Sequence, residues 1–151
     1  MIDFKKAYDK VNRDTLLRSL NKHGIKGRIF SNIKALYSRV EYSIRTTNRT
    51  LDPISSNLGL KQGCPLSPIL FNLYINDMSS HFKTNNITDK VILQGEELSH
   101  FLYADDLVII SKSKAGLQEK LNGISTFAKE KYHTIDIKKA KLWFLTRMVR
   151  H

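Results

Sequence analysis

Cysteine and proline are scarce in this sequence: one cysteine, Cys64, and three prolines occur in 151 residues. A single cysteine excludes an intrachain disulfide and a cysteine-based zinc site, and it fits a reducing, intracellular compartment. No uncharged stretch approaches the roughly 18 residues that a membrane-spanning helix needs, and the amino terminus lacks the apolar core of a signal peptide. We therefore expect no membrane partner and a protein that is soluble or associated with nucleic acid.

Acidic residues are scarce toward both ends of the chain. The whole sequence has 25 Lys and Arg against 14 Asp and Glu, which gives a formal charge of +11. Residues 1–50 contain 12 basic and 4 acidic residues, residues 112–151 contain 10 and 3, and residues 51–111 contain 3 and 7. An acidic centre between basic flanks suits a carboxylate site beside surfaces that attract phosphate, so we expect a polyanionic partner. A solvated basic surface without a ligand is the alternative.

The composition, 41% hydrophobic and 26% charged, is that of one globular domain. Hydrophobic periodicity, capping residues and turn residues predict an α+β fold, with helices packed on one face of a small antiparallel sheet. A helix that starts at Ser67 is apolar nearly all round and is therefore expected to be buried. Strands are predicted at 2–4, 40–44, 51–54, 91–93, 134–137 and 142–145, a hairpin at 98–111, and helices from Asn12 or Asp14 to Gly24, from 28 to 37, from Ser67 onward and from Ser113 onward.

Two adjacent carboxylates, Asp105 and Asp106, separate apolar runs at 101–104 and 107–110. This pattern is typical of a buried hairpin with its polar residues at the tip. Carboxylates held close together repel each other unless cations neutralise them, and Mg²⁺ prefers oxygen ligands. An ordinary surface turn is the alternative. If Asp3 faced the pair from a second strand, the three carboxylates would form a two-metal site for phosphoryl transfer.

Three segments resemble the motifs of reverse transcriptases, in the order in which that family has them. Residues 3–9, Asp-Phe-Lys-Lys-Ala-Tyr-Asp, resemble motif A, and residues 103–106, Tyr-Ala-Asp-Asp, resemble motif C. Residues 59–77, with Gln-Gly-Cys-Pro-Leu-Ser-Pro and Leu-Phe-Asn, resemble motif B in the form found in non-LTR (LINE-type) retrotransposons. The resemblance implies that residues 1–151 are the palm of a reverse transcriptase domain, without its fingers and thumb, from a longer polyprotein.

The resemblance also implies roles for single residues. Asp3, Asp105 and Asp106 would hold two Mg²⁺ ions, with Mn²⁺ as a substitute, and Phe4 would offer its backbone carbonyl. Tyr8 corresponds to the steric gate that favours deoxynucleotides; a core aromatic is the alternative. Gln62 and Gly63 correspond to the substrate-binding loop that lies along the template and the incoming nucleotide. For Gly63, a plain turn glycine is the alternative.

Residues 125–139 resemble motif D less closely. The family usually has glycine where this chain has Tyr132, and commonly asparagine where it has Asp136, so the exit of the preceding helix is expected to be distorted. Lys139 aligns with the lysine of the motif, a catalytic proton donor to the pyrophosphate leaving group. A surface lysine in a basic run is the alternative.

The implied reaction is RNA-templated DNA synthesis. Its partners would be an RNA template, a DNA primer, deoxynucleoside triphosphates and the rest of the polyprotein, with fingers, a thumb and in some such elements an endonuclease. The alternative is an inactive retroelement remnant that acts at most as a basic nucleic-acid-binding module. We expect the 151 residues alone to have little or no polymerase activity, because the parts that position the substrates are missing.

Overall fold

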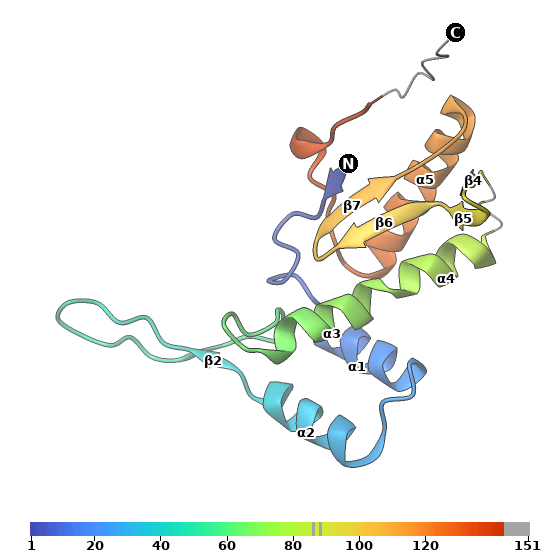
Figure 1. The fold of residues 1–151 in the computed structure, drawn as a ribbon. Helices are drawn as coiled ribbons and strands as arrows, with labels where there is room; N and C mark the ends of the chain where they lie inside the picture. The colour runs from blue at the N-terminus through green and yellow to red at the C-terminus, as the bar shows by residue number, and fades with distance from the viewer. Residues whose placement is uncertain (86, 88, 144–151) are drawn as a thin grey trace, which may run out of the picture.

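The computed structural model describes residues 1–85, 87 and 89–143, and it shows the predicted mixture of helices and antiparallel strands (Figure 1). A central three-stranded sheet lies beside the long helix α5, and helices α1 to α4 form a second group below it (Figure 1). The elements are β1 (Ile2–Asp3), α1 (Arg13–Lys22), α2 (Gly27–Ser38), β2 (Glu41–Tyr42), β3 (Ile54–Ser55), α3 (Leu66–Ile75), α4 (Asp77–Thr84), β4 (Val91–Leu93), β5 (Glu96–Leu98), β6 (His100–Tyr103), β7 (Asp106–Ile109), α5 (Lys114–Glu130) and the 3-10 helix η1 (Ile137–Lys139).

The central sheet has the order β1-β7-β6, and both pairings are antiparallel. The segment 134–141 runs along the other edge of β1. The amide of Asp136 donates to the carbonyl of Asp3 at 2.8 Å, and the amide of Lys141 donates to the carbonyl of Met1 at 3.0 Å. The amino-terminal strand is therefore held from both sides by parts of the chain that lie far away in sequence.

The two strands predicted near the carboxyl end do not form as expected. The segment 134–137 contributes one bridge, between Phe4 and Ile135, and then turns into the 3-10 helix η1. Asp136 starts this turn, because its side chain accepts from the amide of Lys138 at 3.2 Å. Residues 142 and 143 are not a strand, and residues 144 and 145 of that prediction lie outside the described part of the chain.

Capping residues account for two of the helix starts. The side chain of Asn12 accepts a hydrogen bond from the amide of Thr15 at 2.9 Å, so the first of the two candidate caps starts α1. Ser113 caps α5 in the predicted way, through the amide of Gly116 at 3.0 Å. Ser67, in contrast, does not cap α3: that helix starts at Leu66, and the hydroxyl of Ser67 donates to the carbonyl of Lys61 at 2.7 Å.

The core lies between the sheet and helices α1, α3, α4 and α5. Helix α3 is buried on most but not all of its faces: Phe71 and Tyr74 are fully buried, whereas Leu66 and Ile69 are 41% and 57% exposed. The expectation that this helix is buried therefore holds for most of its surface, but not for the face that carries Leu66 and Ile69. The largest buried apolar side chains are Phe4, Val11, Leu16, Leu20, Leu70, Phe71, Tyr74, Met78, Leu107, Ile124 and Phe127.

A buried polar network around Asp77 joins three helices. The carboxylate of Asp77 at the start of α4 accepts from Lys131 Nζ at 2.7 Å, from Ser19 Oγ at 2.9 Å and from Lys22 Nζ at 3.3 Å. Burial alone would raise the pKa of Asp77, but the hydrogen bonds from Lys131 and Ser19 hold it below its usual value. Asp77 therefore stays ionised and joins α1, α4 and the end of α5.

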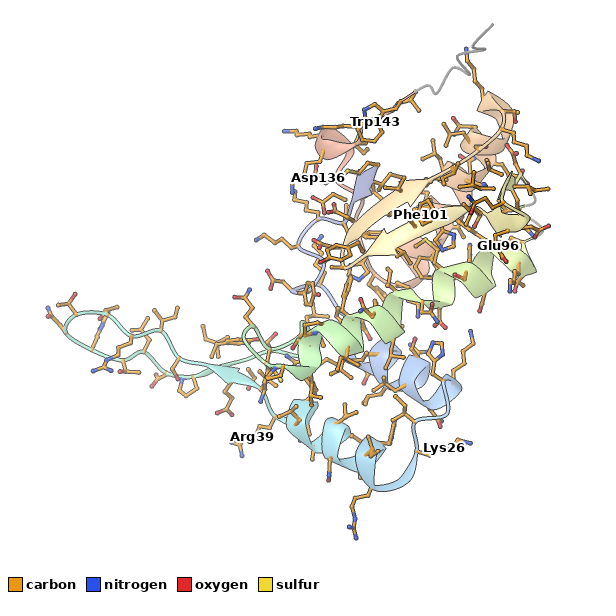
Figure 2. All side chains as sticks on the ribbon, viewed as in Figure 1. Lys26, Arg39, Glu96, Phe101, Asp136 and Trp143 are labelled. Atoms are coloured by element: carbon orange, nitrogen blue, oxygen red, sulfur yellow. The ribbon has the colours of Figure 1, made fainter. Side chains whose placement is uncertain are left out.

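Two hairpins stand apart from the central sheet. Strands β2 and β3 form the base of an arm that projects from the body, and their side chains stand off into solvent (Figure 2). Strands β4 and β5 form a short hairpin whose turn residues Gln94 and Gly95 both have positive φ, 51° and 86°. Within the described residues, none of the helices combines the length and the hydrophobicity that crossing a bilayer requires.

Candidate functional site

The pairing of β1 with β7 brings the three predicted carboxylates to one end of the sheet. Asp3 lies directly opposite Asp106, and Asp106 lies opposite Tyr103 on its other side. Directly opposed residues in an antiparallel pair point to the same face of the sheet. Asp105 lies in the two-residue turn after Tyr103, where Ala104 has a φ of 52°. The structure thus places Asp3 beside the hairpin, which sequence reasoning could only assume.

The hairpin of β6 and β7 is more exposed than the sequence predicted. Leu107 is fully buried, but Phe101 on β6 is 50% exposed and Tyr103 is 84% exposed (Figure 2). The prediction of a buried hairpin is therefore wrong for the outer face of β6. The reason is that α5 lies behind this small sheet, while no described element lies in front of β6 and β7 (Figure 1). A large substrate can consequently reach Asp106, which is exposed, and Asp105, which is partly exposed, whereas Asp3 is 9% exposed.

Lys139 pairs with a carboxylate, although its side chain is 67% exposed. Its Nζ lies 2.5 Å from Asp3 Oδ2, and the Asp3 side chain is 12% exposed. The hydrogen bond from Lys139 to Asp3 and the charge of Asp3 raise the pKa of the lysine, and the charges of Asp136 and Asp105 add to this effect. Asp3, Asp105 and Lys139 therefore share one electrostatic environment, although Lys139 follows Asp3 by 136 residues.

Tyr8 lies next to the same environment. Its ring stacks on Phe71, with 4.5 Å between ring centroids and 20° between ring planes, and it is half-buried. Burial raises the pKa of Tyr8, and the negative charge of Asp105 raises it further. Phe4, in contrast, is 1% exposed, so its side chain belongs to the core.

Gln62 and Gly63 lie in the loop before α3. Gln62 Nε2 donates to Asp9 Oδ1 at 3.1 Å, so this loop contacts the end of motif A at Asp9. Gly63 is exposed and has a φ of +74°, with open space around the position of a side chain. A plain turn glycine explains this conformation, and the open space also leaves room for a ligand.

Arg13 is a positioning residue that the sequence analysis missed. It is 6% exposed, and its guanidinium donates to the carbonyls of Ser56 at 2.5 Å, Leu58 at 2.8 Å and Gly59 at 2.9 Å. These three bonds fix the segment that leads into Gln62. No local signal could have found this role, because the partners follow Arg13 by 43 to 46 residues.

The donor chemistry at this end of the sheet fits a divalent cation, because carboxylate oxygens are the ligands that Mg²⁺ prefers. The ammonium group of Lys139 against Asp3 shows that this carboxylate attracts a cation. Residues 1–85, 87 and 89–143 nevertheless contain no group of three His, Cys, Asp or Glu side chains gathered closely enough to hold a metal. Two-ion binding therefore stays a prediction.

The small antiparallel sheet thus carries a hairpin with two adjacent carboxylates, and a third carboxylate lies on the neighbouring strand. The model of the family "Reverse transcriptase (RNA-dependent DNA polymerase)" matches residues 1–150, and the chain belongs to this family. The resemblance inferred from the three motifs is thereby confirmed.

Similar proteins include products of mobile elements of insects. One is the retrovirus-related Pol polyprotein from the type-1 retrotransposable element R2 of Nasonia vitripennis, 28% identical over 134 residues, which are 86% of this chain and 12% of that protein. Another is the RNA-directed DNA polymerase from the mobile element jockey of Drosophila melanogaster, 25% identical over 84% of this chain and 14% of that protein. The chain spans less than a fifth of these relatives.

Proposed function

We propose that this chain is the palm of an RNA-directed DNA polymerase of a non-LTR retrotransposon. The observation that carries the proposal is the pairing of Asp3 with Asp106 across β1 and β7, with Asp105 in the adjoining turn. A phosphoryl-transfer site needs carboxylates from separate elements, because one side chain cannot orient two metal ions. Membership in the reverse transcriptase family supports the same reaction.

In the proposed reaction, the 3′-hydroxyl of a DNA primer attacks the α-phosphate of a deoxynucleoside triphosphate, and pyrophosphate leaves. Asp3, Asp105 and Asp106 would hold divalent ions, which supply activation of the hydroxyl and stabilisation of the leaving oxygen. Lys139 would give its proton to the pyrophosphate. Lysine is protonated at neutral pH at its ordinary pKa, and the hydrogen bond and charge of Asp3 raise the pKa of Lys139 further.

The other site residues bind and orient the substrates. Tyr8, backed by Phe71, would press against the sugar of the incoming nucleotide, and its rigid stacking makes it suited to reject a 2′-hydroxyl. Gln62 and Gly63 would lie along the template and nucleotide, with Arg13 and Asp9 holding their loop. The backbone carbonyl of Phe4 completes the proposed ligand set.

The proposal is tested by primer extension with the parent polyprotein on an RNA template. Replacing Asp105 by Asn removes one carboxylate charge with little change in shape, and we expect extension to fall by about 100-fold or more. Asp52→Asn, a matched change at an exposed position on the arm, is the control and should leave the rate unchanged. Extension at the wild-type rate by the Asp105→Asn protein contradicts the carboxylate assignment, and a parent frame that cannot extend primers at all favours the inactive remnant.

A further inference from the structure

The stretch of chain around helix α2 contains no acidic residue. Residues 15–40 include six Lys or Arg and no Asp or Glu, although the whole chain has 14 acidic residues. Helix α2 buries Ile33 and Tyr37 and packs against α1, which packs in turn against α3. It therefore lies on the side of α1 and α3 that faces away from the central sheet (Figure 1). Its exposed side is thus remote from Asp3 and Asp105.

The outer face of α2 carries two cations with short side chains between them. Arg28 and Lys34 are exposed, as are Ser31, Asn32 and Ala35, and these five residues define the face. Within the described part of the chain, the side chains of the two cations make no ion pair and no hydrogen bond. Six positions, or about 9 Å of helix rise, separate Arg28 from Lys34, so the two can reach different phosphates of one strand.

The stability of α2 does not account for these cations. The helix begins at Gly27 without a side-chain cap, and its first turn has Arg28 and no acid. Positive charge at the start of a helix is unfavourable, because the free amides there already carry partial positive charge. Helix α1 shows the stabilising arrangement, with Asn12 as its cap and Asp14 in its first turn. A bound anion would turn the positive charge of α2 from a cost into an attraction.

We propose that the outer face of α2 binds the phosphate backbone of a base-paired RNA stem, away from the carboxylates. The aromatic residues of α2, Phe30 and Tyr37, are half-buried and buried, so the face has no ring on which an unpaired base could stack. Single strands are bound largely through such stacking, whereas a duplex hides its bases and presents phosphates. Ser31 and Asn32 are short hydrogen-bonding side chains, and the wide, shallow groove of an RNA duplex displays 2′-hydroxyls that they can reach. DNA lacks these hydroxyls.

A protein partner fits this face less well than RNA does. Protein interfaces bury an apolar core, commonly with aromatic anchors. Of the 12 residues of α2, all of them described, Ile29 is the one large apolar side chain that is mostly exposed, at 66%. Single exposed apolar side chains are common on soluble proteins. The composition of the face therefore matches a polyanion. The proposal goes beyond the polymerase function, since it adds a second contact with RNA outside the reaction site.

The test is nucleic-acid binding by the 151-residue chain, measured by fluorescence anisotropy in EDTA over a range of salt concentrations. The probes are an RNA hairpin of about 16 base pairs, its DNA counterpart, and an RNA strand of equal length that cannot pair. We expect the wild type to bind the RNA hairpin more tightly than the other two. The double variant Arg28→Gln, Lys34→Gln should bind the RNA hairpin about 10-fold more weakly at about 0.1 M salt. Its plot of log K against log salt should be less steep by about 2, because each cation releases about one counterion.

The matched control is the double variant Lys83→Gln, Lys129→Gln, which removes the same charge from exposed positions on α4 and α5. It should keep the wild-type salt slope. The variant Arg28→Lys, Lys34→Arg keeps both charges and should bind as the wild type does, which separates loss of charge from misfolding.

The proposal is overturned if the wild-type chain does not bind the RNA hairpin, or if it binds the DNA hairpin or the unpaired strand as tightly. It is also overturned if the α2 variant keeps the wild-type slope, or if the control variant loses as much affinity as the α2 variant, since only net charge would then matter. The measurement needs neither metal nor nucleotide, so it can fail independently of the Asp105→Asn test.

Discussion

His133 should make the folded protein sensitive to mild acid. The residue is 6% exposed, and its ring lies 5.7 Å from that of Phe4 and 5.5 Å from that of Tyr74, measured between centroids. Neither ring nitrogen has a hydrogen-bond partner among the described residues. Burial lowers the pKa of His133 to about 4, with smaller contributions from the positive charges of Lys10 and Lys131. A proton on this ring would be a buried charge without a partner.

The size of the effect follows from the two pKa values. An unfolded histidine takes up its proton near pH 6.5, and folded His133 only near pH 4, so between these values the unfolded chain binds more protons. The stability of the folded state therefore falls as the pH falls from about 6.5 to about 4. The loss from this one residue should be about 2 kcal/mol at pH 5 and about 3 kcal/mol below pH 4.

The assay is urea unfolding at pH 7 and pH 5, followed by circular dichroism, for the wild type and His133→Leu. Burial also lowers the pKa of His100, which therefore titrates in the same direction, so the difference between the two proteins isolates His133. Asp77 and Asp89 have lowered pKa values, and they affect stability only at more acidic pH. We expect the variant to lose about 2 kcal/mol less than the wild type between pH 7 and pH 5. Equal losses in both proteins would refute the reasoning.

Two further changes test how the chain holds the site segments. Lys131→Met should destabilise the protein by about 3–5 kcal/mol in urea unfolding, because it leaves the buried Asp77 without its closest cation. The control is Lys129→Met, a change at an exposed neighbouring position, which should change stability by less than about 0.5 kcal/mol. Similar losses in both variants would argue against the network. Tyr132 has a φ of 60° and is 65% exposed, so Tyr132→Gly should stabilise the protein by about 0.5–1 kcal/mol through the relief of backbone strain. Tyr132→Ala removes the same ring but keeps a side chain in the strained conformation. Equal stability of the Gly and Ala variants would contradict the explanation by backbone strain.

Features that depend on neighbouring residues were predictable from the sequence. The Asn12 and Ser113 caps act within three residues, and both helices start as predicted. Tyr132 stands where the family usually has glycine, and the structure shows the left-handed conformation that glycine would adopt without strain. Ser67 failed as a predicted cap because α3 already starts at Leu66, so Ser67 lies inside the helix, where its hydroxyl donates to the carbonyl of Lys61.

Features that depend on distant residues were not predictable without the family resemblance. The opposition of Asp3 and Asp106 joins residues separated by 103 positions, and the bonds of Arg13 to its carbonyl partners and of Lys131 to Asp77 span 43 to 54 positions. No periodicity or capping rule contains such a pairing. The motifs supplied the identity of the carboxylates, and the register of the sheet supplies their arrangement.

The position of Asp3 shows how much the proposed site depends on the whole domain. Strand β1 is only two residues long, too short to be stable alone, and it is held by β7 on one edge and by residues 134–141 on the other. Both partners lie more than 100 residues away, so Asp3 reaches its place only when the chain between them has folded. Lys139 comes from the same outer segment, and a shift of that segment would move the carboxylate and its lysine together. The site is therefore expected to form or to be lost as a single cooperative unit.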